Sequence, residues 1–201
     1  MADPFPAQTR RAALAAVLSA GAAAGASTLS GKAEAAEAPP LAVHTGGPHD
    51  FDFLAGRWTV QHRYLKARLA GGSDWLECDG TMQLWPTMGG EANIDDNVIN
   101  RPDGAYRAMS IRAYDGRTQQ WSIWWVDGRS PAGPLEPPVR GGFKDGVGRF
   151  FSNDVFNGKP IVCRYIWSGI SPTTAHWEQA FSPDGGKTWE TNWHMAFTRA
   201  G

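Results

Sequence analysis

The sequence predicts an all-β protein folded as a single antiparallel up-and-down β-barrel of about nine or ten strands. Apolar and polar residues alternate with a period of two along most of the chain from residue 56 to residue 199, as in half-buried strands. Turn residues interrupt this pattern at short intervals, and the region lacks the apolar periodicity of a helix. Consecutive hairpins of this kind favour a closed barrel over a sandwich.

Residues 1–35 are predicted to be an export signal that resembles a twin-arginine leader. Arg10 and Arg11 precede a weakly apolar run rich in Ala, Gly and Ser, and Ala33-Glu34-Ala35 forms an A-x-A cleavage pattern. We therefore expect a periplasmic or secreted protein, with ordinary secretion as the alternative route. Residues 36–48 read as a flexible lead-in, and residues 49–201 as the barrel domain.

Composition narrows the class of partner. The 19 basic and 20 acidic residues leave a formal charge of −1, which argues against nucleic acid as a partner. No run of about 18 apolar residues follows the leader, so we expect no membrane span in the mature chain. Ten tryptophans are unusual and suit a pocket for a small-molecule ligand. We expect no cofactor, and the sequence leaves a homodimer open.

The elements follow from local patterns. A short turn at residues 49–54 is predicted to direct the side chains of Phe51, Phe53 and Leu54 into the core. Turn residues at 115–117, 144–146 and 157–159 predict hairpins, whereas the prolines of residues 127–138 predict a loop. The strand-like segments are residues 58–64, 75–85, 91–97, 106–114, 120–127, 139–143, 148–156, 160–167, 174–181 and 189–199.

The segment from Ser182 to Trp189 reads S-x-D-x-G-x-T-W, the Asp-box pattern known from sialidases. A propeller of that class needs the motif to return at a fixed period, and this chain contains one copy. Asp184 can accept hydrogen bonds from nearby backbone N–H groups, and Gly185 and Gly186 tolerate positive φ. The pattern therefore predicts a hairpin turn and no sugar-cleaving site.

Two cysteines, Cys78 and Cys163, lie far apart in the sequence within strand-like segments. We expect two free, buried thiols, with a disulfide as the alternative in an oxidising compartment.

Gly56-x-Trp58 in the first strand and Arg199 at the end of the last strand form a pattern that resembles the lipocalin and calycin superfamily. The segments FDFLAGRW, MGGEANIDDNV, YRAMSIRAYD, WSIWWVDGR, FKDGVGRF and WEQAFSPDGGKTWETNWHMAFTR, in that order, resemble an uncharacterised bacterial family of lipocalin-like, calycin-type barrel domains. The resemblance implies the barrel, with Arg199 lying across Trp58. It supplies no catalytic residues, so function must be argued from the site.

His62 shares its strand face with Trp58, Val60 and Tyr64, so an inward face would place the imidazole inside the barrel. An interior neutral histidine can hold a ligand, bind haem iron or transfer a proton. The alternative is a core histidine whose nitrogens are satisfied by neighbouring polar groups.

Glu91, Asn93, Asp95 and Asn97 alternate along one strand. If they face inward, they supply hydrogen-bonding groups to the cavity, with Arg112 as counter-charge; if outward, they form a solvated ladder. The candidate ligand-binding residues are His62, Asn93, Asp95, Asn97, Arg112 and Trp125. No catalytic or metal-ligating residue is assigned.

Two hairpin registers are predicted from the turns. Across the turn at residues 115–117, Arg112 should lie opposite Trp121. Trp124 and Trp125 are adjacent in a strand, so one faces inward and the other does not. Trp125 is placed opposite Ala108.

In the last hairpin, Trp177 should lie opposite Trp193, and His176 opposite His194 near Glu178. Two histidines and a carboxylate raise a metal hypothesis. The apolar face should point inward, however, which would leave the histidines in solvent without a third well-placed ligand.

The function predicted from these residues is binding of a largely apolar small molecule in a tryptophan-lined barrel cavity. One alternative is an isomerase, cyclase or hydrolase that uses His62 with Asp95 or Asp127 as an acid/base pair. A second alternative is a structural barrel whose interior is filled by side chains and binds no ligand.

Overall fold

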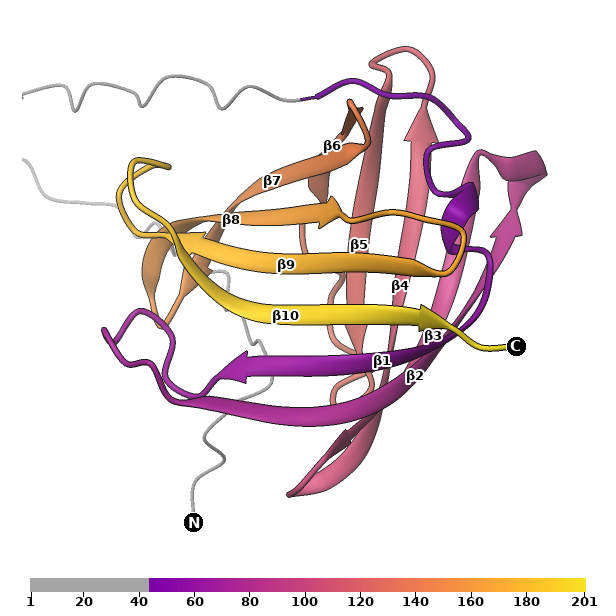
Figure 1. Ribbon diagram of the computed structural model, residues 1–201. Coiled ribbons are helices and arrows are strands. Elements are labelled where there is room, and N and C mark those ends of the chain that lie inside the picture. The colour runs from indigo at the N-terminus through magenta and orange to yellow at the C-terminus, as the bar shows by residue number, and fades with distance from the viewer. Residues whose placement is uncertain (1–43) are drawn as a thin grey trace, which may run out of the picture.

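The computed structural model describes residues 44–201, which fold into one β-barrel (Figure 1). The predicted export signal at residues 1–35, and residues 36–43 of the predicted lead-in, lie outside the described residues. The rest of that lead-in is tied to the barrel, because Gly46 N–H donates to the Gln119 carbonyl and Tyr114 Oη donates to the Gly46 carbonyl.

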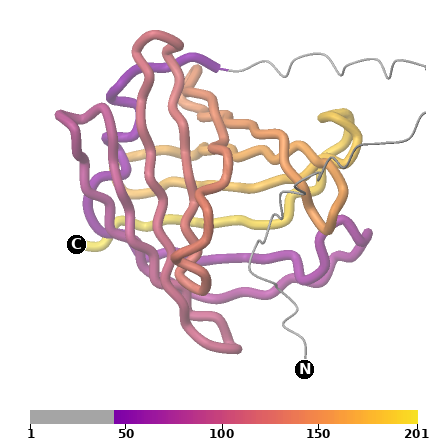
Figure 2. The backbone as a smooth tube through the Cα atoms, turned by 180° about the vertical axis from the view of Figure 1, so that it is seen from behind, coloured from indigo at the N-terminus to yellow at the C-terminus, as the bar shows by residue number. Residues whose placement is uncertain are grey.

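Ten antiparallel strands close into the barrel, each pairing with the next along the chain and β10 pairing with β1. Figure 2 shows β3, β4 and β5 in front of β8, β9 and β10. The all-β, up-and-down barrel is thereby confirmed and is consistent with a lipocalin-like fold. The strands are β1 (Gly56–Leu65), β2 (Trp75–Thr87), β3 (Ala92–Arg101), β4 (Gly104–Asp115), β5 (Gln120–Asp127), β6 (Val139–Lys144), β7 (Val147–Phe156), β8 (Lys159–Ser168), β9 (Thr174–Ser182) and β10 (Glu190–Arg199).

Helical structure in the described region is limited to two single turns, η1 (Asp52–Leu54) and η2 (Met88–Gly90). No helix among residues 44–201 has the length and apolar character needed to cross a membrane.

Two of the predicted turns have the geometry that tight hairpins require. Asp145 and Gly146, between β6 and β7, have φ values of 53° and 76°. Asn157 and Gly158, between β7 and β8, have values of 51° and 76°. Paired positive φ angles match the right-handed twist of the flanking strands, and Asn, Asp and Gly tolerate them best. The loop predicted at residues 127–138 is also present, between β5 and β6.

One end of the barrel is closed by η1 and by the contact that the resemblance implies. Phe51 and Leu54 are buried beneath this turn, and Trp58 donates from Nε1 to the Leu54 carbonyl at 2.9 Å. The Arg199 guanidinium lies 4.3 Å from the Trp58 ring centroid. It also donates to the carbonyls of Phe53, Ala55 and Pro172, so one side chain joins both ends of the barrel sequence.

The opposite end, here called the distal end, carries the β1–β2, β3–β4, β5–β6, β7–β8 and β9–β10 connections. The Asp-box segment is the β9–β10 turn, as predicted. Asp184 accepts from the backbone N–H groups of Lys187 and Thr188, and Trp189 Nε1 donates to the Gly186 carbonyl. These bonds use the motif's polar residues within the turn itself.

The predicted register of the β4–β5 hairpin is wrong by two residues. Arg112 pairs with Ile123, and Trp121 pairs with Tyr114. The cause is a four-residue turn at residues 116–119, in which Gln119 takes a φ of 56°. A slip of two residues preserves the strand face, so the inward set is unchanged.

The predicted register of the β9–β10 hairpin is also wrong. Trp177 pairs with Met195, and Trp193 pairs with Gln179. The turn is one residue longer than expected, and a bulge between Thr191 and Trp193 adds a second offset. The two offsets add up to a shift of two residues, so Trp177 and Trp193 still face inward. The bulge has a second effect, which is to bury the Asn192 side chain next to the β9–β10 turn.

Cys78 and Cys163 are free thiols, as predicted; Cys163 is buried, whereas Cys78 is half-buried.

Candidate functional site

The barrel encloses a cavity lined mainly by aromatic rings. The cavity has a volume of about 30 Å³, measured as the space that the centre of a water molecule can occupy. Nine of the ten lining residues are buried, and Trp125 is half-buried. We call this space the tryptophan cavity; it is lined by Ser110, Arg112, Ile123, Trp125, Tyr165, Trp167, Trp177, Gln179, Trp193 and Met195.

The aromatic walls hold one another in fixed orientations. Trp193 makes edge contacts with Trp125 and Trp177, at centroid distances of 5.5 and 5.2 Å and interplanar angles of 88° and 85°. Tyr165 packs against Trp177 at 4.8 Å. Edge-to-face packing of this kind is favoured by the ring quadrupoles.

The polar end of the tryptophan cavity is Arg112, which β3 holds in place. Asn93, Asp95 and Asn97 face inward and are buried, so the inward alternative for this ladder is the correct one; Glu91 is exposed. Arg112 donates to Asp95 Oδ2 at 2.6 Å and to Asn93 Oδ1 at 3.1 Å. Arg112 is therefore the counter-charge of the inward ladder, as predicted, and it pairs with Asp95.

Asp95 is the centre of this network. Its Oδ1 accepts from the Ser110 backbone N–H and from Asn97 Nδ2, both at 2.7 Å. The Arg112 and Asp95 side chains are 5% and 3% exposed, so both charges are removed from water and depend on each other. Arg112 Nε is buried without a hydrogen-bond partner. The network thus presents a neutral pair to the cavity, and the Nε–H of Arg112 is left without a hydrogen-bond partner.

His62 lies inside the barrel, 1% exposed, but it does not line the tryptophan cavity. Trp193 Nε1 lies 3.3 Å from His62 Nδ1, and Tyr64 Oη lies 3.4 Å from the same atom. An indole N–H can only donate, so Nδ1 accepts and the proton of the neutral ring is on Nε2. Burial lowers the pKa of His62 to about 4, against a small opposing effect of Asp79.

Gly80 explains how the ring fits against β2. A Cβ placed on Gly80 would lie 2.8 Å from His62 Nε2 and 2.4 Å from the Val98 carbonyl oxygen. Only glycine leaves room for the imidazole there. His62 therefore supports the cavity wall through Trp193, and its role in the structure is that of a packed, hydrogen-bonded core histidine.

The sequence suggested His62 with Asp95 or Asp127 as an acid/base pair, but each of these three residues bonds to other partners. His62 bonds with Trp193 and Tyr64, whereas Asp95 bonds with Arg112. Asp127 forms an ion pair with Arg129 at 2.7 Å. Within residues 44–201, therefore, neither Asp95 nor Asp127 is in hydrogen-bond contact with the imidazole, as proton transfer between them would require.

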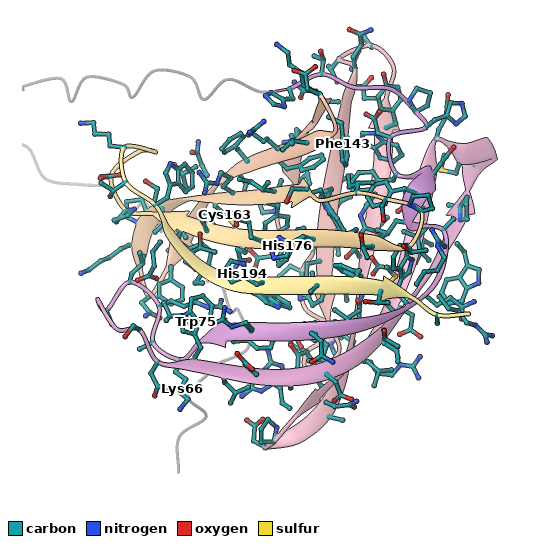
Figure 3. All side chains as sticks on the ribbon, in the orientation of Figure 1. Lys66, Trp75, Phe143, Cys163, His176 and His194 are labelled. Atoms are coloured by element: carbon teal, nitrogen blue, oxygen red, sulfur yellow. The ribbon has the colours of Figure 1, made fainter. Side chains whose placement is uncertain are left out.

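The histidines of the last two strands lie on the outer wall (Figure 3). His176 and His194 have ring centroids 5.4 Å apart, and Glu178 pairs with His194 across the strands. Within residues 44–201, no group of three or more His, Cys, Asp or Glu side chains is placed to hold a metal ion.

Of the six residues predicted to bind ligand, Arg112 and Trp125 line the tryptophan cavity. Asn93, Asp95 and Asn97 lie behind Arg112, and His62 lies behind Trp193. Sequence reasoning missed Tyr165, Trp167 and Gln179 as lining residues. Their signal was present, since Gln179 alternates with Trp177 and Tyr165 alternates with Trp167 on inward faces.

No protein-family model matches the chain, and a search of curated proteins gives no match. Among solved structures, the chain is similar to EF1p2_mFAP2b bound to DFHBI, with 11% identity over 76% of this chain and 98% of that one and a TM-score of 0.42. It is also similar to the S-type phycobiliprotein lyase CPES from Guillardia theta, with 8% identity over 75% of this chain and 90% of that one and a TM-score of 0.44. Likenesses this distant carry no information about ligand or activity.

Proposed function

We propose that the protein binds a small, largely apolar, ring-shaped molecule in the tryptophan cavity. The observation that carries the proposal is the combination of aromatic walls with a buried donor at the cavity, Arg112 Nε, that has no hydrogen-bond partner. A filled core gains nothing from an unpaired buried N–H, because such a group costs free energy. A ligand with an apolar ring and one acceptor atom would satisfy both features.

The second candidate is a filled structural barrel, and the size of the cavity favours it. A volume of about 30 Å³ holds one or two water molecules and is well below that of typical ligand pockets. Entry of a ring therefore requires a lining side chain to move. Trp125 is the candidate for this movement because it is the half-buried member of the lining.

Titration with 2-acetylnaphthalene, a flat ketone with one acceptor, separates the two candidates. We expect saturable quenching of tryptophan fluorescence in the full chain, with a dissociation constant on the order of 10 µM. Quenching is expected because the ring would lie against Trp125, Trp177 and Trp193. Quenching that never saturates, or none, would leave the filled barrel as the better description.

A matched pair of Ile→Phe substitutions, one on β5 and one on the neighbouring strand β4, supplies the control. Ile123→Phe enlarges a side chain that lines the tryptophan cavity, so it should abolish saturable quenching. Ile111→Phe enlarges a half-buried side chain on the outer wall beside Trp124 and should leave quenching unchanged. Equal effects of both substitutions would place the probe elsewhere.

The proposed place of action is the periplasm or the exterior of a bacterial cell, as part of the family that the sequence resembles. The support is the Arg10-Arg11 pair, the weakly apolar run and the A-x-A pattern ending at Ala35. Expression of the full chain should yield an exported product shortened by residues 1–35, which intact mass would show. Arg10→Lys with Arg11→Lys should retain it in the cytoplasm; export that survives this change would point to ordinary secretion.

A further inference from the structure

One polar side chain of the tryptophan cavity has no part in the binding proposed so far. Gln179, on β9, lines the cavity and is 1% exposed. A side-chain amide carries donors on its nitrogen and an acceptor oxygen, so its orientation decides which chemistry it offers. The neighbouring Asn192 fixes that orientation.

Asn192 is buried beside the β9–β10 turn, and a backbone carbonyl orients its amide. Asn192 Nδ2 donates to the Glu190 carbonyl oxygen at 3.5 Å, so the nitrogen faces Glu190. Asn192 Oδ1 then faces Gln179 and accepts from Gln179 Nε2 at 2.7 Å. The nitrogen of Gln179 is therefore turned toward a residue outside the cavity lining, and Oε1 is the amide atom left for the cavity.

Gln179 Oε1 is an acceptor without a donor. Among residues 44–201, the bond to Asn192 is the only hydrogen bond of the Gln179 side chain, and it uses the nitrogen. A carbonyl oxygen removed from water without a donor costs free energy. Because buried polar side chains are normally paired, a free acceptor on a cavity wall indicates that a ligand supplies the donor.

Gln179 and Arg112 lie on opposite walls of the barrel. The path from β9 to β4 takes five steps in either direction, through β8, β7, β6 and β5 or through β10, β1, β2 and β3. Figure 1 accordingly shows β9 in front of β4. Arg112 Nε is a donor without a partner, so the two walls offer complementary halves of a hydrogen bond.

We propose that the ligand carries a hydroxyl or N–H donor that binds Gln179 Oε1, at the end of its ring system remote from the acceptor that faces Arg112. This inference rests on the proposed function and adds the polarity of the ligand. Gln179 is uncharged, and Asp95 balances the charge of Arg112, so both ends suit neutral groups. A phenolic ketone is a ligand of this chemical class.

The compounds 6-hydroxy-2-acetylnaphthalene and 6-methyl-2-acetylnaphthalene test the inference on the full chain. Hydroxyl and methyl groups are close in size, so the pair differs in one donor at the end remote from the ketone. We expect the 6-hydroxy compound to bind about 10-fold more tightly, because the methyl group leaves Oε1 without a donor. Saturable tryptophan quenching at about pH 6, where the phenol is neutral, measures both affinities. The isomer 1-hydroxy-2-acetylnaphthalene, whose hydroxyl lies beside the ketone, should lack this gain.

Gln179→Met should remove the preference for the 6-hydroxy compound, since methionine has a similar length and no amide oxygen. The affinity for the 6-methyl compound should stay within about 2-fold of that of the parent chain, because this compound makes no hydrogen bond to Oε1. Gln61→Met is the control, because Gln61 is exposed on β1. It should leave the preference intact.

Equal affinities for the 6-hydroxy and 6-methyl compounds in the parent chain, or a preference that survives Gln179→Met, would overturn the inference while leaving the proposed function standing. If circular dichroism shows that Gln179→Met does not fold, the two hydroxy isomers decide in the parent chain, and equal affinities for them overturn the inference. Failure of all three compounds to bind would instead remove the proposed function, and the inference with it.

Discussion

Replacing Asp95 with alanine should lower the free energy of unfolding by about 4 kcal/mol. The substitution leaves the buried Arg112 guanidinium without its counter-charge, and it removes the acceptor used by the Ser110 N–H and Asn97 Nδ2. Breaking one side of a buried ion pair is costly because the remaining charge stays out of water. Urea unfolding of the full chain at neutral pH measures the effect.

The adjacent residue provides the control. Asp96 pairs with Arg107 on the outer wall, where the two side chains are 34% and 67% exposed. Asp96→Ala should therefore cost less than about 1 kcal/mol. The double variant Asp95→Leu with Arg112→Met should recover the part of the loss that comes from the unpaired Arg112 charge, while Ser110 N–H and Asn97 Nδ2 stay without their acceptor. A cost for Asp95→Ala no larger than that for Asp96→Ala would contradict the buried network.

Acidification should destabilise the protein through His62. The pKa of His62 in the fold is about 4, below the ordinary value of 6.5, because the imidazole is buried. Between these two values the unfolded chain binds a proton that the folded chain does not, so stability falls as the pH falls. The loss attributable to His62 is about 2 kcal/mol between pH 7 and pH 5, and it levels off below the folded pKa.

His62→Asn isolates this contribution, because the amide oxygen can still accept from Trp193 Nε1 while the side chain no longer titrates. The variant should lose about 2 kcal/mol less than the parent chain over the same pH interval, as read from urea midpoints. His176→Asn removes a histidine from the outer wall and is the control. Parallel stability profiles for the parent chain and His62→Asn would show that the imidazole is not held neutral by burial.

The fold was predictable because its determinants are local. Alternation with a period of two identified the strands, and turns such as Asn157-Gly158 identified where they reverse. The contact between Trp58 and Arg199 was predictable from the resemblance alone, since nothing in the spacing of two residues at opposite ends of a chain shows that they meet.

Registers were less predictable because they depend on turn length and bulges. The turn at residues 116–119 and the bulge beside Asn192 each shifted the pairing, and neither has a sequence signal as strong as Asn-Gly. The inward faces survived because both total shifts were two residues. A single-residue error would have placed Trp177 and Trp193 on the outside.

The site shows where sequence reasoning stops. By itself the sequence determined a barrel of hairpins with an aromatic interior, because alternation and turn chemistry act between neighbouring residues. Tertiary structure alone decided that Asp95 neutralises Arg112 and that Trp193 separates His62 from the cavity. These outcomes depend on which side chains from distant strands meet in a space shielded from water, where a missing or present counter-charge governs what the protein can bind.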